Sequence, residues 1–322
     1  VTWFFFNLLT GSMLLVAVAQ NAMLFIIAWE TMSLASFFLV IFENQLANVR
    51  RAGWIYLVAT HIGTAFLLVM FILLGGQSHV LRFAEYASFP VSSDLTTIVF
   101  VLALIGFGTK AGFVPMHVWL PEAHPAAPSH VSAVMSGVMI KTGIYGLIRI
   151  ITFLGPPMPA WGFTLLLIGL MSGVVGILLA LAQRDMKSLL AYSSVENIGI
   201  VAMGLGIGYL GIAYASPGMV FMGFGGALFH VFNHAIFKSL LFMSTGAVMH
   251  ATGTRDIDQL GGLLKRMPNT GKVFLVGAIA ICGLPPLNGF VSEFIIYAAA
   301  FEAITGTTTI AVFGVLTIAA LA

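Results

Sequence analysis

The chain has 322 residues, of which 60% are hydrophobic and 7% are charged, with 13 basic and 11 acidic residues. An average soluble domain is about 25% charged, so this sequence lacks the polar residues that a soluble fold needs on its surface. The mean hydropathy of +1.06 and the recurring apolar runs predict an all-α, polytopic membrane protein.

The same composition excludes several kinds of site. The single cysteine, Cys282, excludes an iron–sulfur cluster held by this chain alone, because such a cluster needs several thiolates. No nucleotide-binding glycine fingerprint follows a strand-like run, and no basic tract suits nucleic acid. We therefore expect no cofactor, no metal ion and no nucleic-acid partner on this chain, and lipid around it. The apolar runs at both ends lead us to expect a piece of a longer protein.

Ten apolar segments are predicted to cross the membrane. They must be helices, because backbone groups in lipid have to find their hydrogen bonds within the segment. In chain order the segments lie near residues 1–19, 22–42, 52–75, 95–120, 129–151, 161–182, 188–211, 217–249, 271–300 and 308–322.

Basic residues gather in three alternate loops, which follow the second, sixth and eighth segments. These loops hold most of the basic residues of the chain, namely Arg50, Arg51, Arg184, Lys187, Arg255, Lys265, Arg266 and Lys272. Because cytoplasmic loops of membrane proteins carry an excess of Lys and Arg, the loops with Arg50, Arg184 and Lys265 are predicted to face the cytoplasm. We expect a multi-pass protein of the inner (cytoplasmic) membrane.

Each half of the chain contains one interrupted segment. The fourth segment is interrupted at Pro115, and the ninth is interrupted at Pro285 and Pro286. Both are fourth in their half, and an odd number of segments in each half inverts the second half. Paired interrupted helices point to an inverted repeat with its site near mid-membrane. We expect one transmembrane domain over 1–322, built from repeats at 1–151 and 160–322.

Charged residues within the first-half segments are Glu30, Lys110 and Lys141. A charge at the centre of a span costs about 2.5–3.5 kcal/mol on insertion scales, so it usually faces a polar cavity. A long basic side chain has an alternative, which is to extend along the helix until its charged end reaches the membrane interface (snorkelling). This is the better interpretation for Arg149, which lies near the end of its segment. For Glu30 the alternative is a neutral, hydrogen-bonded acid that serves only helix packing.

The second half contains His230, His234, Lys238 and Glu293 within its segments. The first three are spaced by four residues, so they project from one face of a helix. Two histidines one turn apart can bind a metal ion, but a metal needs further ligands and the neighbouring lysine repels a cation. A hydrogen-bonded polar row and a structural pair of histidines remain as the other interpretations.

Further polar residues have less certain roles. His117, Glu122, His124 and His130 lie where the interrupted fourth segment meets the following loop. They form either an ordinary polar loop or a wet mouth where protons enter. His61 and Glu196 also fall within segments, and we expect both to face inward without assigning either a role.

Burial gives the charged groups a common chemistry. Desolvation disfavours the charged form of lysine and of glutamate, so such groups can take up and release protons near neutral pH. A nearby carboxylate instead keeps the proton on a lysine, so a Glu–Lys pair whose separation changes acts as a switch. Interrupted helices admit water and line the path with free backbone groups. The predicted proton sites are Glu30, Lys110, Lys141, His230, His234, Lys238 and Glu293.

The sequence resembles the antiporter-like, proton-translocating membrane subunits shared by respiratory complex I, membrane-bound hydrogenases and multi-subunit cation/proton antiporters. The resemblance covers essentially the whole chain, as a ten-helix core without flanking helices. It is carried by AWETMSL, TKAGFVPMHVWLPEAHPAAPSHVSA, MIKTGIYG, DMKSLLAYSSVENIG, HVFNHAIFKSLLFMSTGAV and LPPLNGFVSEF. ENQLANVRRAGWIYLVATHIGT looks most like the large membrane subunit of formate hydrogenlyase and hydrogenase-4 complexes.

The resemblance implies a role for each predicted site. Glu30 and Lys110 would form the coupling pair of a first half-channel, and Glu293 would be the terminal site of a second. Lys141 and Lys238 would continue a polar axis along the middle of the membrane, with the two histidines beside Lys238.

The resemblance also implies a function, namely a proton-translocating membrane subunit of a multi-subunit redox complex of hydrogenase-4, formate hydrogenlyase or NADH:quinone oxidoreductase type. Its partners would be other membrane subunits and peripheral hydrogenase or dehydrogenase subunits with iron–sulfur clusters, which would carry the redox chemistry. One alternative is a subunit of a secondary cation/proton antiporter or an inorganic-carbon uptake system. Another is a membrane anchor with vestigial charges, although an anchor has no use for costly buried ions.

Overall fold

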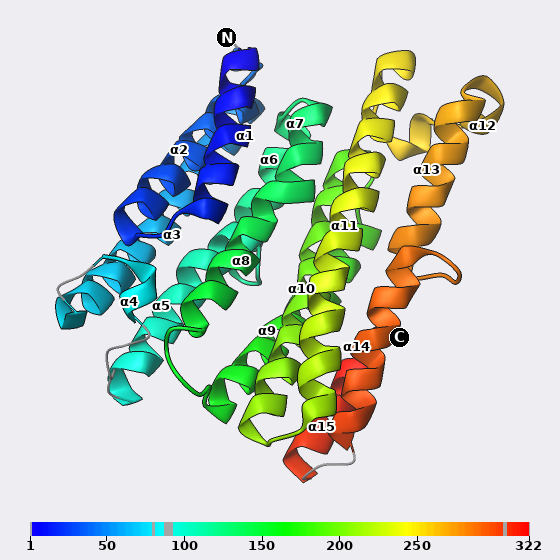
Figure 1. Ribbon diagram of the computed structural model, residues 1–322. Helices are drawn as coiled ribbons and strands as arrows, with labels where there is room; N and C mark the ends of the chain where they lie inside the picture. Colours follow the sequence, from blue (N-terminus) through cyan, green and yellow to red (C-terminus); the bar gives the residue numbers. More distant parts are fainter. Residues whose placement is uncertain (1, 79–80, 87–92, 305–307, 322) are drawn as a thin grey trace. The chain divides into compact units, whose positions relative to one another are not determined.

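A computed structural model describes residues 2–78, 81–86, 93–304 and 308–321 (Figure 1). Every regular element in these ranges is a helix, and the extended backbone is limited to two isolated bridges. The prediction of an all-α fold is therefore confirmed. The chain divides into two compact units. Unit 1 comprises Val1–Gly112, Met116–Val131 and Val138–Gly155, and unit 2 comprises Phe113–Pro115, Ser132–Gly137 and Pro156–Ala322.

Unit 1 is built around an aromatic core. Its helices are α1 (Thr2–Val18), α2 (Ala22–Val40), α3 (Ala47–Ser78), α4 (Phe83–Tyr86), α5 (Ser93–Ala111), η1 (Met116–Trp119), α6 (Leu120–Ala126) and α8 (Ile140–Ile151) (Figure 1). The rings of Phe25, Trp29 and Phe107 meet with centroids 5.3–5.9 Å apart, which binds α2 to α5. Aromatic pairs at such distances add to the free energy gained from burial alone.

Unit 2 is centred on one almost completely buried helix. Its helices are α9 (Pro159–Leu181), α10 (Met186–Ala213), α11 (Pro217–Thr252), η3 (Ile257–Gln259), α12 (Leu263–Arg266), α13 (Pro268–Ile281), α14 (Asn288–Ile304) and α15 (Thr308–Leu321) (Figure 1). Helix α10 packs between α9 and α11. A Cβ atom at Gly169 or Gly199 would collide with the backbone of the opposite helix, so these glycines let α9 and α10 touch closely.

The helices have the length and composition of membrane spans. Within the described residues, seven helical stretches are long and apolar enough to cross a bilayer, and α1 and α13 are shorter apolar helices. The fifth predicted segment is one of the seven, but it is not a regular α-helix. It contains α7 (Ser129–Val134) and then a π-helical turn, η2 (Met135–Met139), before α8. Such wider turns are rare and are found frequently at functional sites.

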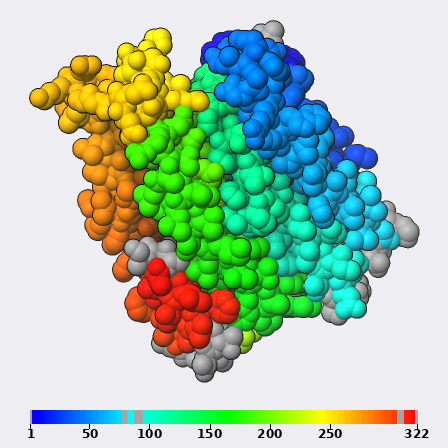
Figure 2. All heavy atoms as spheres, turned by 180° about the vertical axis from the view of Figure 1, so that it is seen from behind, coloured from blue at the N-terminus to red at the C-terminus, as the bar shows by residue number. Residues whose placement is uncertain are grey.

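Large apolar side chains lie on the surface of unit 1, as expected for contact with lipid. On α3, which Figure 2 shows in blue grading to cyan along one face of this unit, Trp54, Ile62 and Ile72 are all more than half exposed. The first turns of α3 also contain Arg50 and Arg51, which the sequence had placed in a loop.

In unit 2, the loop after α9 and the loop after α11 contact each other through ion pairs and a hydrogen bond. Arg255 forms an ion pair with Asp185, and Arg184 Nη1 lies 3.0 Å from Asp258 Oδ1. A hydrogen bond from the Met186 amide to the Arg255 carbonyl (3.1 Å) joins the same segments. The chain following α9 and the chain following α11 therefore lie on the same side of this unit. Lys187, which the sequence had counted as a loop cation, is instead buried in the first turn of α10.

Candidate functional site

The first predicted helix interruption lies at the end of α5. The helix ends at Ala111, Gly112 adopts a left-handed conformation with φ +89°, and Pro115 follows before η1 begins at Met116. A proline lacks the amide hydrogen that would continue the helix. The indole Nε1 of Trp119 turns back and donates to the carbonyl of Thr109 at 2.7 Å. A side chain therefore satisfies a backbone acceptor that the interrupted helix leaves free.

Lys110 occupies the last turn of α5, immediately before this interruption, and its side chain is 2% exposed. Its Nζ donates to Ser33 Oγ at 2.9 Å and to Tyr56 OH at 3.4 Å. It also lies 5.6 Å from the ring centroid of Trp29, within range of a cation–π contact. Lys110 is thus held by hydroxyl groups from α2 and α3 and by an aromatic face.

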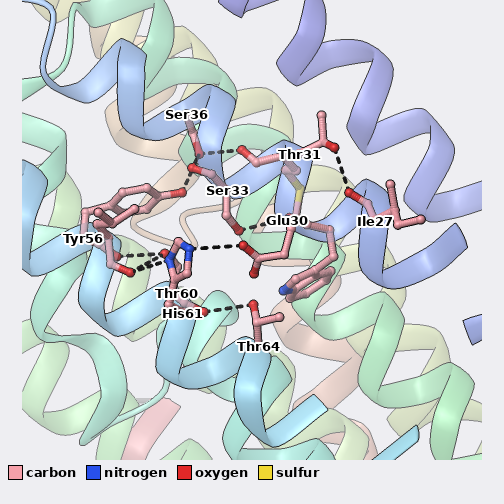
Figure 3. A network of polar contacts seen from close by, with 12 residues as sticks. Ile27, Glu30, Thr31, Ser33, Ser36, Tyr56, Thr60, His61 and Thr64 are labelled. Atoms are coloured by element: carbon pink, nitrogen blue, oxygen red, sulfur yellow. Dashed lines mark hydrogen bonds and ion pairs between the residues drawn. The ribbon is translucent and has the colours of Figure 1, made fainter. Parts of the chain in front are cut away.

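Further hydroxyl groups lie close together on α2 and α3, namely those of Ser36, Tyr56 and Thr60 (Figure 3). Tyr56 OH makes a hydrogen bond with Ser36 Oγ, which also donates to the Ser33 carbonyl at 3.0 Å. Thr60 Oγ1 donates to the Tyr56 carbonyl at 3.0 Å, one turn further along α3. These hydroxyls can both donate and accept, so they can pass a proton between neighbours.

Glu30, near the middle of α2, is paired with His61 of α3 (Figure 3). Its Oε2 lies 3.3 Å from His61 Nε2, and His61 Nδ1 bonds to the carbonyl of Leu57 at 2.9 Å. The other carboxylate oxygen, Oε1, is buried and has no hydrogen-bond partner among the described residues. Glu30 is therefore bonded to a histidine, and the resemblance-derived pair of Glu30 with Lys110 has no direct contact in this structure.

The position of His61 differs from the prediction. Its side chain is 47% exposed, so the expectation that His61 faces inward was wrong. A residue within an apolar segment is placed inward by default, because charge is costly in lipid. His61 instead shares an exposed face with the carboxylate that it contacts.

Lys141 begins α8 directly after the π-helical turn and is 8% exposed. A Cβ atom at the nearby Gly143 would collide with the backbone of α5, so the two helices are in close contact there. Arg149, at the end of α8, donates to Gln20 Oε1 at 3.1 Å and covers the ring of Phe83. This position near a helix end agrees with the snorkelling interpretation of Arg149.

The four polar residues of the predicted mouth do not share one environment. Glu122 is exposed, whereas His124 is completely buried within α6. His130 stacks on Trp3 of α1, with ring centroids 6.4 Å apart. The set therefore extends from the surface into the core of unit 1.

In unit 2, Lys238 lies on α11 and is completely buried. Its Nζ donates to the Leu190 carbonyl at 2.7 Å and to Ser193 Oγ, both on α10. Lys238 thus resembles Lys110 in one respect, because each ammonium is held by a serine hydroxyl of a neighbouring helix. An electrostatic attraction also acts between Lys238 and the carboxylate of Glu196.

His230 and His234 share the α11 face with Lys238, and all three are completely buried. Nε2 of His230 lies 3.2 Å from Asn197 Oδ1, and its Nδ1 lies 3.0 Å from Ser292 Oγ. The rings of the two histidines stack with centroids 6.3 Å apart. The hydrogen bonds of His230 join α10 and α14 through α11, as expected for a polar row. No cluster of three His, Cys, Asp or Glu side chains suited to a metal ion occurs among the described residues.

The second interruption separates α13 from α14. After α13 ends at Ile281, Gly283 has φ +59°, and Pro285 and Pro286 precede Asn288. Asn288 Nδ2 donates to Asn233 Oδ1 at 3.1 Å, and Asn233 Nδ2 donates to the Asn288 carbonyl at 2.8 Å. This reciprocal pair fixes the start of α14 to α11.

Glu293 projects from the first turns of α14 back toward the interruption. A Cβ atom at Gly283 would collide with Glu293 Oε2, so the missing side chain makes room for the carboxylate. Glu293 also lines a cavity of about 550 Å³ between helices of unit 2. Cys282, Ser193 and Glu196 lie on the wall of the same cavity.

Sequence reasoning missed the uncharged partners of the lysines. Ser33, Tyr56, Ser193, Asn197 and Ser292 hold the buried charged groups, and none was singled out from the sequence. One signal was present, because Ser33 lies three residues after Glu30 and so shares a face of α2 with it.

Known proteins are similar to this chain in sequence and in structure. Hydrogenase-4 component B of Escherichia coli (strain K12) is 44% identical over 303 residues, which cover 93% of this chain and 45% of that protein. Formate hydrogenlyase subunit 3 of the same strain is 36% identical over 301 residues, which cover 92% and 48%. The structure of the Mrp complex from Dietzia sp. DQ12-45-1b matches with a TM-score of 0.86 at 29% identity, over 98% of this chain and 34% of that one.

The chain spans about half the length of the curated relatives that it matches. A family model described as "NADH:quinone oxidoreductase/Mrp antiporter, TM" matches residues 19–319, nearly the whole sequence. The fold, the interrupted helices and the buried charges all lie within this range. The chain belongs to the NADH:quinone oxidoreductase/Mrp antiporter family of transmembrane proteins.

Proposed function

We propose that this chain is the proton-conducting core of a membrane subunit in a multi-subunit redox complex of the hydrogenase-4 or formate hydrogenlyase type. The observation that carries the proposal is the environment of Lys110 and Lys238. Each lysine is buried within a helix bundle of a membrane protein and is bound by hydroxyl groups, with no carboxylate in direct contact among the described residues. An ammonium in such a site can lose its proton at a small cost, because no ion pair has to be broken.

Protons would move through two series of groups. In unit 1, the series would run from Glu30 to Lys110 and on to Lys141, with the hydroxyls of Ser33, Ser36 and Tyr56 gathered at the Lys110 end. In unit 2, Lys238, His230, His234 and Glu293 form the second series. The interruptions at Pro115 and at Pro285 and Pro286 would let water reach the ends of these series. We propose that residues 1–151 and 160–322 are inverted repeats of one another.

The driving reaction would take place on other polypeptides. The similarity to hydrogenase-4 component B and formate hydrogenlyase subunit 3 supports other membrane subunits as neighbours. Peripheral hydrogenase or dehydrogenase subunits with iron–sulfur clusters would supply the electron transfer, and a conformational or electrostatic change would pass from them to the buried charges.

The proposed orientation places the loops with Arg50, Arg184 and Lys265 on the cytoplasmic side of the inner membrane. The ion pair of Arg255 with Asp185 supports a location on the same side of the membrane for the segment after α9 and the segment after α11. The excess of basic residues in these loops supports the cytoplasm as that side.

A secondary cation/proton antiporter subunit, or a subunit of an inorganic-carbon uptake system, is the second candidate function. The likeness to the Mrp complex structure and the family description support the antiporter. In that case the gradient of a second ion, rather than a redox reaction, would drive the same proton path.

The experiment that separates the two functions is gentle detergent extraction of the full-length native protein, followed by mass spectrometry of the proteins that remain bound. Co-purifying hydrogenase or dehydrogenase subunits would support the redox pump. Small membrane subunits alone, together with sodium or bicarbonate flux in proteoliposomes, would support the second function. Proteoliposomes of the purified complex that show no proton movement under either driving force would contradict both.

A further inference from the structure

Glu196 is a partly buried carboxylate that the proton series described above leaves out. It lies on α10, where Gly176 of α9 makes room for its backbone, because a Cβ atom there would collide with the Glu196 nitrogen. Its Oε2 accepts a hydrogen bond from Asn197 Nδ2 at 2.9 Å. Close helix packing and this amide therefore hold the carboxylate in one place.

Two charged side chains from different helices act on the carboxylate of Glu196. Lys238 of α11 attracts its carboxylate, and Glu293 of α14 repels it. Glu196 therefore interacts electrostatically with both Lys238, the buried lysine of unit 2, and Glu293, the acid at the helix interruption. The ionised form of Glu196 is favoured while Lys238 is charged and is disfavoured while Glu293 is ionised, so its protonation depends on both neighbours.

The direct hydrogen bonds between side chains do not provide a proton path from Glu196 to Glu293. Asn197 connects Glu196 to His230, whose Nδ1 contacts Ser292 beside Glu293. A side-chain amide does not exchange protons readily, so this connection positions the groups without carrying protons. The path between the two acids therefore needs a chain of water molecules or hydroxyl groups.

The cavity in unit 2 provides the room for that water. Its volume is about 550 Å³, and its wall includes Ser193, Glu196 and Glu293. One water molecule needs only about 10–15 Å³ of such volume, so the cavity holds several when polar groups are present to bind them. Ser193 Oγ on its wall also accepts the hydrogen bond of Lys238. The hydroxyl of Ser193 therefore connects the Lys238 ammonium to the cavity.

We infer that Glu196 is a proton-transfer residue, which exchanges protons with Lys238 through Ser193 and with Glu293 through water in this cavity. The inference rests on the proposed function, because it extends the proton path of unit 2. In each step a proton leaves one oxygen or nitrogen for another, and no electron or further reactant is required.

The test uses the native, full-length complex reconstituted in proteoliposomes, with the proton gradient followed by a fluorescent dye. Glu196→Gln should lower proton transport by more than tenfold while the complex remains assembled on a native gel. Glu302→Gln is the matched control, since Glu302 is an exposed acid near the end of α14, and it should leave transport near the wild-type rate. Wild-type transport in an assembled Glu196→Gln complex would overturn the inference.

A second variant tests the inference if the complex with Glu196→Gln does not assemble. Glu196→Asp keeps an acid but withdraws it by one methylene, so transport should fall several-fold and its pH profile should shift. An unchanged rate and pH profile in the Asp variant would also overturn the inference. These outcomes are distinct from failure of the proposed function, in which the wild-type complex itself would move no protons.

The cavity can be tested without changing an acid. Cys282 lies on the cavity wall and is exposed, so a small charged thiosulfonate reagent should reach it, fill the cavity and block transport. A complex with Cys282→Ala should keep its transport in the presence of the reagent. Full transport by a wild-type complex that is labelled at Cys282 would rule out the cavity as the path.

Discussion

The imidazole of His61 lies 3.3 Å from the carboxylate of Glu30, and the two side chains are 47% and 26% exposed. Both residues lie near the middle of helices that are long and apolar enough to span a bilayer. Bare hydrocarbon is a costly environment for such a pair, because neither group could be solvated there. We therefore expect another membrane subunit or water to cover this face of unit 1 in the intact complex.

The first prediction concerns this pair. His61→Gln should lower proton transport and reduce the stability of the assembled complex, because Glu30 loses the imidazole that contacts its carboxylate. Because both side chains are partly exposed, the loss of stability should be no more than about 1 kcal/mol. Thermal inactivation midpoints and transport rates of His61→Gln, Glu30→Gln and the double variant give the comparison. If the two residues act together, the double variant will be no worse than the poorer single one, and additive losses would contradict the pairing.

The second prediction concerns Lys110. Lys110→Ala should abolish coupled proton movement while leaving assembly intact, because the remaining hydroxyls of Ser33 and Tyr56 hold no excess proton. Lys272→Ala serves as the control, since Lys272 is an exposed cation in the first turns of α13. The measurement is dye-monitored acidification of proteoliposomes that contain the native complex. Acidification at the wild-type rate in the Lys110 variant would end its assignment as a proton site.

The third prediction compares two acids of one helix. Glu293→Gln should reduce transport far more than Glu302→Gln, because Glu293 faces the helix interruption and the cavity while Glu302 lies near the end of α14. Both changes replace a carboxyl group by an amide and keep the shape of the side chain. Equal losses in the two variants would show that the effect does not come from a site at Glu293.

The fourth prediction separates backbone strain from the space that Glu293 occupies. Gly283 and Gly253 both have a left-handed φ, of +59° and +73°, but only a side chain at 283 would meet the carboxylate. Alanine at either position should cost about 1–2 kcal/mol of stability from the backbone alone. Only Gly283→Ala should also impair proton transport. Comparable transport losses in both variants, measured beside their thermal inactivation midpoints, would contradict a specific role for the space at Gly283.

The sequence predicted those features that are local along the chain. The helices and the burial of Lys110, Lys141 and Lys238 could be predicted, because hydropathy and the cost of a charge in lipid depend on a short stretch of residues. The partners of these lysines could not. Lys110 meets Ser33 across 77 positions of sequence, and Lys238 meets Ser193 across 45, so both contacts depend on how separate helices pack.

Two errors have the same origin. His61 was expected to face inward, and Lys187 was counted among the loop cations, although it is buried in α10. The face of a helix that is buried is set by its neighbours, and hydropathy alone does not contain that information when nearly every residue is apolar. The π-helical turn before Lys141 was also missed, although its sequence contains the pair Ser136–Gly137, at which helices commonly become irregular.

The collision at Gly283 has a consequence for related sequences. Because the Glu293 carboxylate occupies the space in which a side chain at 283 would begin, a larger residue at 283 would displace the flexible end of Glu293 from the helix interruption, and we expect the two positions to covary. Homologues that replace this glycine should also have altered the acid, whereas homologues that keep the acid should keep the glycine. A pairwise count over aligned family members would therefore reveal covariation between these two positions, and it would mark the helix interruption and the acid as a single inherited unit.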